Sequence, residues 1–510
     1  MAIDASMLPL VVLKQIFQFL NNSEILTASL VCKGWMNAIN FHQLICDFKI
    51  QFSGEIDEKV KFLHSMQHQF QLFSFSEVPI SDSVVKFLKE NSKQFVTLSF
   101  HGCRLVRGKS DPRFPDRILE CDNLKTLDVE SSDVLYLFAA IPNVTNLRLF
   151  YLYLTDYIVS RLKESLSKLE VLSLTGCIAS EEKEYKSYYV NEAAIETNPS
   201  QIVFTFESVK RLIEKNRISL RSIDFHNVVL SSSTFVAIAE INGLRLSSVV
   251  FPKTFNAKYL REFCENQPSL ISLNLSFRNR TNKQALYNEA INEVCECLPN
   301  LQEFIMRSND EIDKGIIEVF PLESLTRLDL TKCVNITKPS YRLAVSNLSA
   351  YQLEYLDLNS AEINDEDLFK LLVGNRDLRY LDVSRTCISD KTLNTISKNL
   401  VLLKYLVLEG CSSISDSGLT GGPGNPAPLS NLRNLRHLDL RSILSITAAG
   451  CLQAIRFPNL ECLLIEGCIN IIADEHFEVQ LRTQNPSVEL NPPLKQKDSD
   501  AYISPTLDLS

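Results

Sequence analysis

The chain has 510 residues, of which 45% are apolar and 22% charged, and its net charge is −9. This composition is typical of a soluble folded protein, and the negative charge argues against a nucleic-acid partner, because phosphate contact needs a basic surface. The sequence lacks an apolar run of about 18 residues and a basic leader, so we expect neither a membrane span nor a secretory signal.

Residues 7–50 predict three short helices. Pro9 stands where the first turn of a helix tolerates proline. Four apolar residues follow at the i, i+3, i+4, i+7 spacing of one helix face: Leu13, Ile16, Phe17 and Leu20. Ser23 predicts the N-cap of a second helix, and the third carries Trp35, the single tryptophan. Three such helices are too small to be stable alone, so we expect them to pack against the repeats or another protein.

The rest of the chain returns to one template, L-x-x-L-x-L, often followed by x-x-C. A period of 20–29 residues indicates a leucine-rich solenoid. A degenerate first unit is predicted at Ile45. About fifteen clearer units begin at Phe70, Phe95, Leu124, Val144, Leu169, Leu220, Leu246, Leu270, Leu301, Leu325, Leu353, Leu378, Leu403, Leu435 and Leu460. Each L-x-L predicts a short strand and segments such as Asp365–Leu372 predict helices, so we expect an α/β solenoid with a curved parallel sheet inside and helices outside.

Two irregularities interrupt this array. The spacing from Leu169 to Leu220 is 51 residues, and the polar, tyrosine-rich run within it predicts an insertion at about 180–210. Such an insertion is either functional or a tolerated surface loop. The Gly- and Pro-rich stretch 421–428 predicts a loop. The repeat pattern ends near Asn485, so we expect the array to span 49–485 and a flexible C-terminal tail to span 486–510.

The 14 cysteines predict reduced thiols, since disulfides are rare without a secretory signal. Five occupy one slot of the repeat, where a small buried side chain is needed: Cys103, Cys177, Cys333, Cys411 and Cys468. The Cys295-x-Cys297 pair lacks the spacing of a zinc site. The seven histidines are scattered, and Gly-x-Ser-x-Gly, Gly-x-x-x-x-Gly-Lys and His-Glu-x-x-His are all absent from the sequence. We therefore expect no metal, no cofactor and no enzymatic activity.

The concave face of the predicted sheet carries two rows of notable side chains. Position 1 is the first leucine of each unit, and position 3 holds Tyr355, Tyr380, Tyr405 and His437. Position 5 holds Asp128, Asp224, Asp329, Asp357, Asp382 and Asp439. A tyrosine cluster is typical of contact surfaces, and an acidic row favours a basic ligand. The alternative is that the aspartates are repeat consensus and the tyrosines a local duplication.

The N-terminal residues resemble the F-box over about forty residues. Three runs carry the resemblance: Leu8-Pro9, Ile16-Phe17-x-x-Leu20 and Ser29-Leu30-Val31-Cys32-Lys33-Gly34-Trp35. An F-box at 4–48 before such an array resembles the F-box and leucine-rich-repeat protein family. The later units are similar to its cysteine-containing subtype, whereas Thr386 before Cys387, and Pro252 in the unit at Leu246, depart from it.

The resemblance implies a non-enzymatic substrate receptor of an SCF-type ubiquitin ligase, in the cytoplasm or nucleus. Its partners would be a Skp-type adaptor, through it a cullin–RING ligase, and an unidentified protein target. The implied adaptor contacts, or their immediate support, are Leu8, Pro9, Ile16, Phe17, Leu20, Leu30, Val31, Cys32 and Trp35. The predicted target contacts are Tyr355, Tyr380, Tyr405, His437, Asp357, Asp382 and Asp439. The alternative function is a repeat scaffold or inhibitor whose helical head only caps the solenoid.

Overall fold

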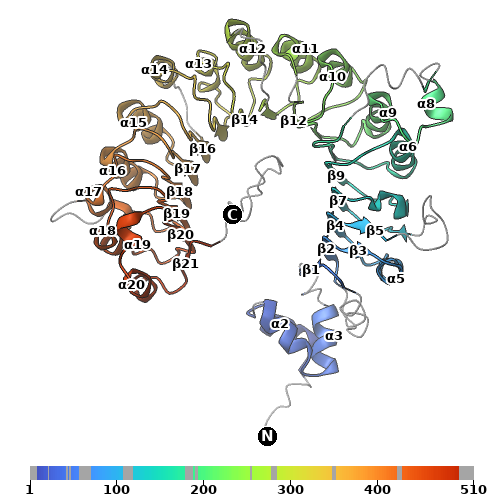
Figure 1. The fold of residues 1–510 in the computed structure, drawn as a ribbon, viewed down its shortest axis with the longest axis horizontal. Coiled ribbons are helices and arrows are strands. Elements are labelled where there is room, and N and C mark those ends of the chain that lie inside the picture. Colours follow the sequence, from blue (N-terminus) through green and yellow to red (C-terminus); the bar gives the residue numbers. More distant parts are fainter. Residues whose placement is uncertain are drawn as a thin grey trace. The chain divides into compact units, whose positions relative to one another are not determined.

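The computed structural model describes residues 8–20, 22–41, 44, 48–56, 70–106, 119–178, 188–189, 193–252, 255–276, 284–346, 352–421 and 428–492. The chain forms two compact units, Met1–Val228 and Val229–Ser510. In each unit, parallel strands form a sheet and helices cover one of its faces (Figure 1). The predicted α/β architecture, with a parallel sheet and outer helices after a helical head, is confirmed.

Three helices form the head of the first unit: α1 (Leu10–Phe17), α2 (Asn22–Ser29) and α3 (Lys33–Phe41). Pro9 is the N-cap residue of α1 with a φ of −55°, which proline adopts without strain. Leu13, Phe17 and Ile39 are buried and form the small core between α1 and α3. The three predicted helices are confirmed, and α2 begins one residue before the predicted N-cap.

The first unit continues with a parallel sheet in which each strand pairs with the next one in the repeat. Its strands, in order, are β1 (Lys49–Ser53), β2 (Leu72–Ser76), β4 (Thr97–His101), β7 (Thr126–Glu130), β9 (Asn146–Phe150), β10 (Val171–Ser173) and β11 (Ser222–Asp224). Short pairs form beside it between β3 (Pro79–Ile80) and β5 (Arg104–Leu105) and between β6 (Leu119–Glu120) and β8 (Phe138–Ala140). Its helical segments are α5 (Asp82–Glu90), η2 (Val134–Leu137), α6 (Asp156–Ser165), α8 (Ala193–Thr197) and α9 (Phe206–Asn216).

The second unit repeats the arrangement with shorter strands. They are β12 (Ser248–Val250), β13 (Ser272–Asn274), β14 (Glu303–Ile305), β15 (Arg327–Asp329), β16 (Tyr355–Asp357), β17 (Tyr380–Asp382), β18 (Tyr405–Val407), β19 (His437–Asp439), β20 (Cys462–Leu464) and β21 (Glu489–Leu490). Its helical segments are α10 (Ser232–Ala239), η3 (Ala257–Tyr259), α11 (Leu260–Asn266), α12 (Gln284–Cys297), α13 (Ile316–Val319), α14 (Lys338–Ser346), α15 (Asp365–Gly374), α16 (Asp390–Asn399), α17 (Asp416–Thr420), η4 (Pro428–Asn431), α18 (Ala448–Ala454), α19 (Ile469–Ile472) and α20 (Phe477–Gln484).

A left-handed residue occupies position 8, after the strand, in each unit of the array in which the structure describes that position. Glycine serves in some units, as at Gly410 (φ 70°), and other residues serve elsewhere, as at Arg385 (φ 55°). The amide of this residue donates to the next unit's position 7 carbonyl, as from Gly176 to His226 at 2.8 Å. The bond from Gly176 to His226 joins the repeats that begin at Leu169 and Leu220. The insertion between them therefore lies within a single repeat.

The cysteine slot is position 9, directly after the left-handed residue, and its predicted burial is confirmed. Each thiol lies 3.0–3.6 Å from a carbonyl oxygen of the preceding unit: Phe75, Leu149, Met306, Val383 or Leu440. Burial raises the pKa of Cys333 to about 12, despite a backbone hydrogen bond from Asn309 that opposes the shift. These thiols therefore stay protonated and serve packing between units.

We expect Cys411→Ser to destabilise the protein by about 1–3 kcal/mol, because a more polar hydroxyl becomes buried. The Cys411 Sγ lies 3.2 Å from the Val383 carbonyl, and the shorter C–O bond holds a hydroxyl farther from that acceptor. Urea unfolding measures the difference. Cys387→Ser is the matched control, since Cys387 is exposed, and an equal loss in both variants would show that the slot has no special role.

The first repeat of the array, which contains β1, differs from its predicted register. Ile50 pairs with Phe73, which is position 4 of its own unit, and Phe52 pairs with Phe75. The start predicted at Ile45 is therefore wrong by two residues. Apolar residues alternate at 48, 50 and 52, and a pattern of period two does not distinguish registers that differ by two.

One strand, β21, extends the sheet beyond Asn485, where the sequence pattern ends. The predicted tail from residue 493 onward, most of the 421–428 loop and the polar run of the insertion lie outside the described residues. In the described part of the chain, no helix has both the length and the apolar character to cross a bilayer.

Candidate functional site

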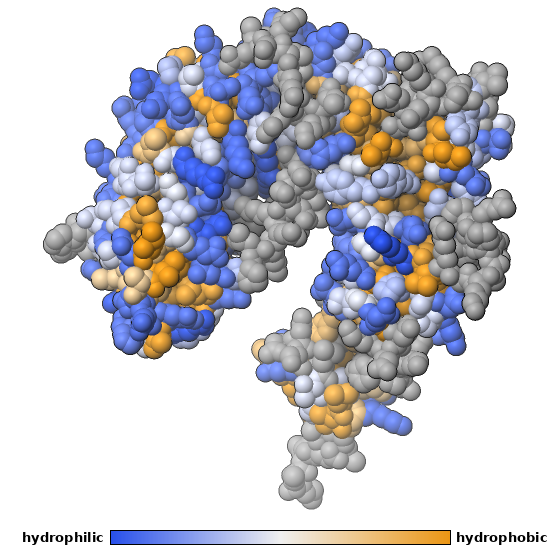
Figure 2. All heavy atoms as spheres, in the orientation of Figure 1, coloured by the Kyte–Doolittle hydropathy of each residue, from blue (hydrophilic) through white to orange (hydrophobic). Residues whose placement is uncertain are grey.

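The head carries an apolar surface that is open to solvent. Phe19 is 89% exposed and Val31 is 61% exposed, although burial of such side chains is normally favourable. Figure 2 shows apolar residues gathered on the visible face of the head. We call this set the head surface: Leu10, Val11, Val12, Ile16, Phe19, Leu30 and Val31. A patch of this kind is typical of a protein–protein contact.

The residues predicted to bind the adaptor divide into exposed and supporting positions. Pro9, Ile16, Leu30 and Val31 are exposed, Leu8, Leu20, Cys32 and Trp35 are half-buried, and Phe17 is fully buried. The Trp35 ring meets the Phe17 ring edge-to-face at 5.2 Å, and the Trp35 amide donates to the Cys32 sulfur at 3.4 Å. Phe17 therefore supports Trp35 from the core of the head.

Sequence reasoning missed Val11 and Phe19, two of the most exposed members of the head surface. The run Leu8-Pro-Leu-Val-Val-Leu13 contained the signal for Val11. An apolar run this continuous cannot fit on a single helix face, so some of its members must face outward. Phe19 follows α1 in a turn and has no comparable signal.

The second candidate site lies on the inner face, meaning the sheet face opposite the helices. The predicted row of aromatic residues is confirmed in register, with Tyr355 beside Tyr380, Tyr405 and then His437. The Tyr355 and Tyr380 rings stack nearly parallel with centroids 4.1 Å apart. The next ring pairs are 6.1 and 5.9 Å apart. At the other end, the Arg327 guanidinium carbon lies 3.7 Å from the Tyr355 centroid, a cation–π contact.

The aromatic row is not the open surface that a contact cluster implies. Tyr355 and Tyr380 are each 3% exposed, whereas Tyr405 and His437 are half-buried. Burial raises the pKa of Tyr355 and of Tyr380 well above the usual value near 10. Both phenols are therefore neutral at any physiological pH.

This burial predicts a stability loss in alkali. The folded state keeps the protons of Tyr355 and Tyr380 above pH 10, whereas the unfolded chain releases them near its ordinary pKa of about 10. The unfolded state then binds fewer protons, so stability falls as pH rises above about 10, by up to about 1.4 kcal/mol per pH unit for each tyrosine. Urea unfolding at a series of pH values measures the slope. Tyr355→Phe with Tyr380→Phe should flatten it, and an unchanged slope would contradict the burial.

Four aspartates of the acidic row are buried, namely Asp329, Asp357, Asp382 and Asp439, whereas Asp128 and Asp224 are half-buried. Asp357, Asp382 and Asp439 each accept a hydrogen bond from the backbone amide two residues later, at 3.0, 2.9 and 3.0 Å. Asp224 makes the same bond at 2.8 Å. This arrangement holds the turn that follows each strand, as a short polar side chain can. The geometry therefore favours the repeat-consensus interpretation of the aspartates.

Arginines further offset the acidic charge of the inner face. Arg441 lies 2.7 Å from the Asp439 carboxylate and 3.0 Å from that of Glu409, and Arg385 lies 2.7 Å from Glu409. Arg307 lies 2.6 Å from the buried Asp329. Although burial opposes ionisation there, Arg307 and the bonds from Thr331 hold the pKa of Asp329 below its usual value.

The insertion is anchored to the first unit through Asp156 at the start of α6. One carboxylate oxygen accepts from the Thr205 amide at 2.8 Å and from its hydroxyl at 2.9 Å. The other accepts from the Tyr189 hydroxyl at 2.9 Å, which itself accepts from the Ser200 amide at 2.6 Å. Both ends of the described part of the insertion are therefore held at one carboxylate.

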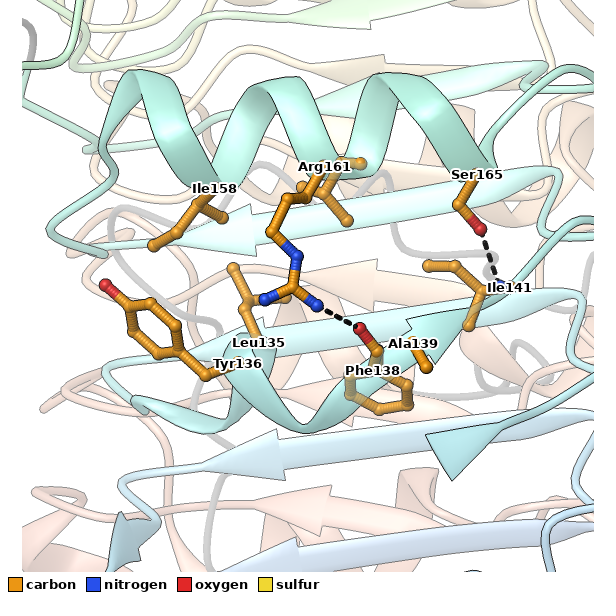
Figure 3. A pocket seen from close by; sticks show the side chains of 9 residues that line it. Leu135, Tyr136, Phe138, Ala139, Ile141, Ile158, Arg161 and Ser165 are labelled. Atoms are coloured by element: carbon orange, nitrogen blue, oxygen red, sulfur yellow. Dashed lines mark hydrogen bonds between the residues drawn. The ribbon is translucent and has the colours of Figure 1, made fainter. Parts of the chain in front are cut away.

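A small hollow lies between η2, β8 and α6 (Figure 3). Arg161 donates to the Phe138 carbonyl at 2.9 Å, and the Ser165 hydroxyl accepts from the Ile141 amide at 2.7 Å. Its volume of about 20 Å³ is enough for one water molecule. Elsewhere in the described residues, no group of three or more His, Cys, Asp or Glu side chains is placed to hold a metal ion.

Comparison with known proteins gives one family match. The F-box domain model matches residues 5–47. No curated protein matches the sequence. The chain is similar in structure to the Rad7 and Elc1 complex of yeast, with 16% identity, a TM-score of 0.49 and coverage of 70% of this chain and 82% of that one.

Two further solved structures are similar over a large part of the chain. The TLR13–ssRNA13 complex has 17% identity and a TM-score of 0.39, with coverage of 80% of this chain and 47% of that one. An internalin, inlF, from Listeria monocytogenes str. 4b F2365 has 16% identity and a TM-score of 0.35, with coverage of 69% and 88%. Residues 5–47 of this chain thus form an F-box domain, followed by repeats that build an α/β fold with a long parallel sheet.

Proposed function

We propose that this chain is a substrate receptor of an SCF-type ubiquitin ligase. Residues 5–47 bind a Skp-type adaptor, and the repeats hold a protein target, so that ubiquitin transfer by the partner enzymes is directed to that target. The observation that carries the proposal is the exposed head surface within a segment that matches the F-box family. An exposed apolar surface on a small helical domain is stabilised when a partner covers it.

The receptor acts by proximity. Binding of the target to the repeats and of the adaptor to the head makes the encounter between target and ubiquitin donor intramolecular, which raises its effective concentration. The target contacts predicted from the sequence belong to the inner face of the second unit: Tyr355, Tyr380, Tyr405, His437, Asp357, Asp382 and Asp439. Because Tyr355, Tyr380 and the three aspartates are buried, we propose Tyr405 and His437 as the direct contacts. Tyr405 and His437 are the more accessible members of this set.

The second candidate function is a scaffold or inhibitor whose head only caps the array. A cap covers the apolar end of a repeat stack with its own apolar residues and presents a polar outer face. Val11, Phe19 and Leu30 are each more than 60% exposed in this chain. Exposure at these positions favours the receptor over the cap.

The test is titration of the full chain with a purified Skp-type adaptor. The wild-type chain should form an equimolar complex, and Trp35→Ala should weaken it by about 2 kcal/mol or more, the loss typical of a buried aromatic anchor. Because Trp35 packs on Phe17, circular dichroism of the variant must accompany the titration. Failure of the wild-type chain to bind would overturn the proposal and favour the cap.

A further inference from the structure

The hydrogen bonds that link successive outer helices stop at α18. In the earlier repeats that contain α15, α16 and α17, the first residue of the helix is an aspartate, which accepts from the N-cap residue of the helix in the following repeat. The first residue of α18 is Ala448, and this helix has no acidic residue in its first turn. His476, the N-cap residue of α20, makes no side-chain cap hydrogen bond. The contact between α18 and α20 therefore lacks the polar link of the earlier repeats.

An open hollow lies where that link would be. It has a volume of about 570 Å³ and is formed by the start of α18 and the segment from α19 to α20. The residues that line it include Ala448, Ala449, Asn470, Ala473, Asp474 and Glu475. Its volume is within the range of about 300–1,000 Å³ that is typical of ligand sites. The hollow is open to solvent instead of enclosed, so it suits side chains that another protein presents better than it suits a small molecule.

Large apolar side chains beside the hollow are exposed. Leu444 and Ile469 both occupy position 10, in adjacent repeats whose strands β19 and β20 pair in register. Ile472 lies at position 13, where Thr447 caps α18 in the repeat before. The exposed fractions of Leu444, Ile469 and Ile472 are 59%, 67% and 59%, and Figure 2 shows apolar side chains gathered over α18 and α19. We call these three residues and the hollow the end surface. A terminal repeat normally presents a polar outer face, so this apolar set is typical of a protein–protein contact.

The charges beside the end surface are acidic. Asp474 and Glu475 line the hollow and are exposed. Helix α20 adds Glu478, and the single basic residue of this helix, Arg482, pairs with Glu478 at 2.9 Å. A symmetric dimer buries the same residues of both chains, so a second copy docked here would bring these carboxylates together. Lysine or arginine on a different protein would pair with them instead.

We propose that the end surface binds a segment of a partner protein in which aliphatic side chains are flanked by lysine or arginine. The aliphatic side chains enter the hollow and cover Leu444, Ile469 and Ile472, which removes apolar area from water. The cations pair with Asp474 and Glu475 and orient the segment. This site belongs to the helical side of the second unit, apart from the inner face that carries Tyr405 and His437, and it does not depend on the proposed receptor function.

The test is photo-cross-linking of the full chain to a synthetic helical peptide that carries a benzophenone, with the sites mapped by mass spectrometry. The peptide has leucines at the i, i+3, i+4 and i+7 positions and lysines elsewhere. It should label residues 444–476. The variant Ile469→Ser with Ile472→Ser should lower the yield at these residues about fivefold or more, and so should Asp474→Asn with Glu475→Gln. Because all four side chains are exposed, both variants should keep the melting temperature of the wild type.

The matched control is Leu343→Ser with Phe369→Ser, which removes apolar side chains that are 51% and 50% exposed on α14 and α15. It should keep the wild-type yield, and a peptide with glutamate in place of each lysine should label residues 444–476 about tenfold less. Equal labelling by the two peptides, or an unchanged yield in Ile469→Ser with Ile472→Ser, would overturn the proposal. Sedimentation of the full chain tests the second copy as the occupant. Self-association that this variant abolishes would assign the end surface to a dimer contact and also contradict the proposal.

Discussion

Val31→Asp is expected to weaken binding of a Skp-type adaptor by about a hundredfold or more without lowering the melting temperature of the chain. Val31 lies in the turn between α2 and α3 and is 61% exposed, so the folded head tolerates a charge there. A covering partner would bury it. Loss of a buried valine costs about 1.5–3 kcal/mol, burial of an unpaired carboxylate adds to this, and about 1.4 kcal/mol is a tenfold change.

The chain offers a closely matched control for this variant. Val229 is 66% exposed and lies in the repeats, so Val229→Asp introduces the same change at a similar exposure, away from the head. It should leave adaptor affinity unchanged. Isothermal titration calorimetry of both variants, with melting curves for each, makes the comparison. If the Val31→Asp variant and the wild-type chain bind the adaptor with equal affinity, the head surface is not the docking site.

Gly450→Ala is expected to destabilise the second unit by about 2–3 kcal/mol, within the range for overpacking of a close contact. A Cβ at Gly450 would lie 2.1 Å from the Asp416 Oδ1. That carboxylate cannot move freely, because it accepts from the Thr447 amide at 2.8 Å and from the Thr447 hydroxyl at 2.7 Å. Either the helix shifts or both hydrogen bonds are lost.

A double-mutant cycle with Asp416→Ala identifies the cause. If the clash with the carboxylate is the origin of the loss, Gly450→Ala should cost much less in the Asp416→Ala background, and the coupling should be about 1 kcal/mol or more. Urea unfolding of the four proteins gives the cycle. Strict additivity would show instead that the backbone at Gly450 is sensitive for another reason.

The contact between Asp416 and Thr447 belongs to a series that links successive outer helices. In each case an aspartate near the start of the helix in one repeat accepts from the N-cap residue of the helix in the following repeat. The pairs are Asp156 with Thr205, Asp313 with Thr337, Asp365 with Ser389, Asp390 with Ser415, and Asp416 with Thr447. Because the carboxylate satisfies an amide that the next helix leaves unpaired, each unit fixes the start of its successor. These bonds set the spacing of helices in each unit.

The sequence alone determined the repeat and most of its internal geometry. Leu353, Leu378 and Leu403 set the period, and the strands form where their L-x-L runs predicted them. The slot that holds Cys411 was identified as buried, and three short helices were predicted in the head, although α1 ends at Phe17, before the predicted Leu20. These features are predictable because each repeat contacts chiefly the repeats beside it. The residue pattern of adjacent repeats is therefore enough to predict which side chains meet.

Only the tertiary structure decided which side chains are open to a partner. Tyr355 and Tyr380 stand in the predicted row yet are buried, and Asp357 is committed to its own turn. Val11 and Phe19 are exposed where the sequence pattern did not single them out. The physical reason is that the repeat period places each strand beside the next one, whereas exposure depends on the side chains of adjacent strands, such as Arg327 and Tyr380 against Tyr355, and on hydrogen bonds that the pattern does not encode.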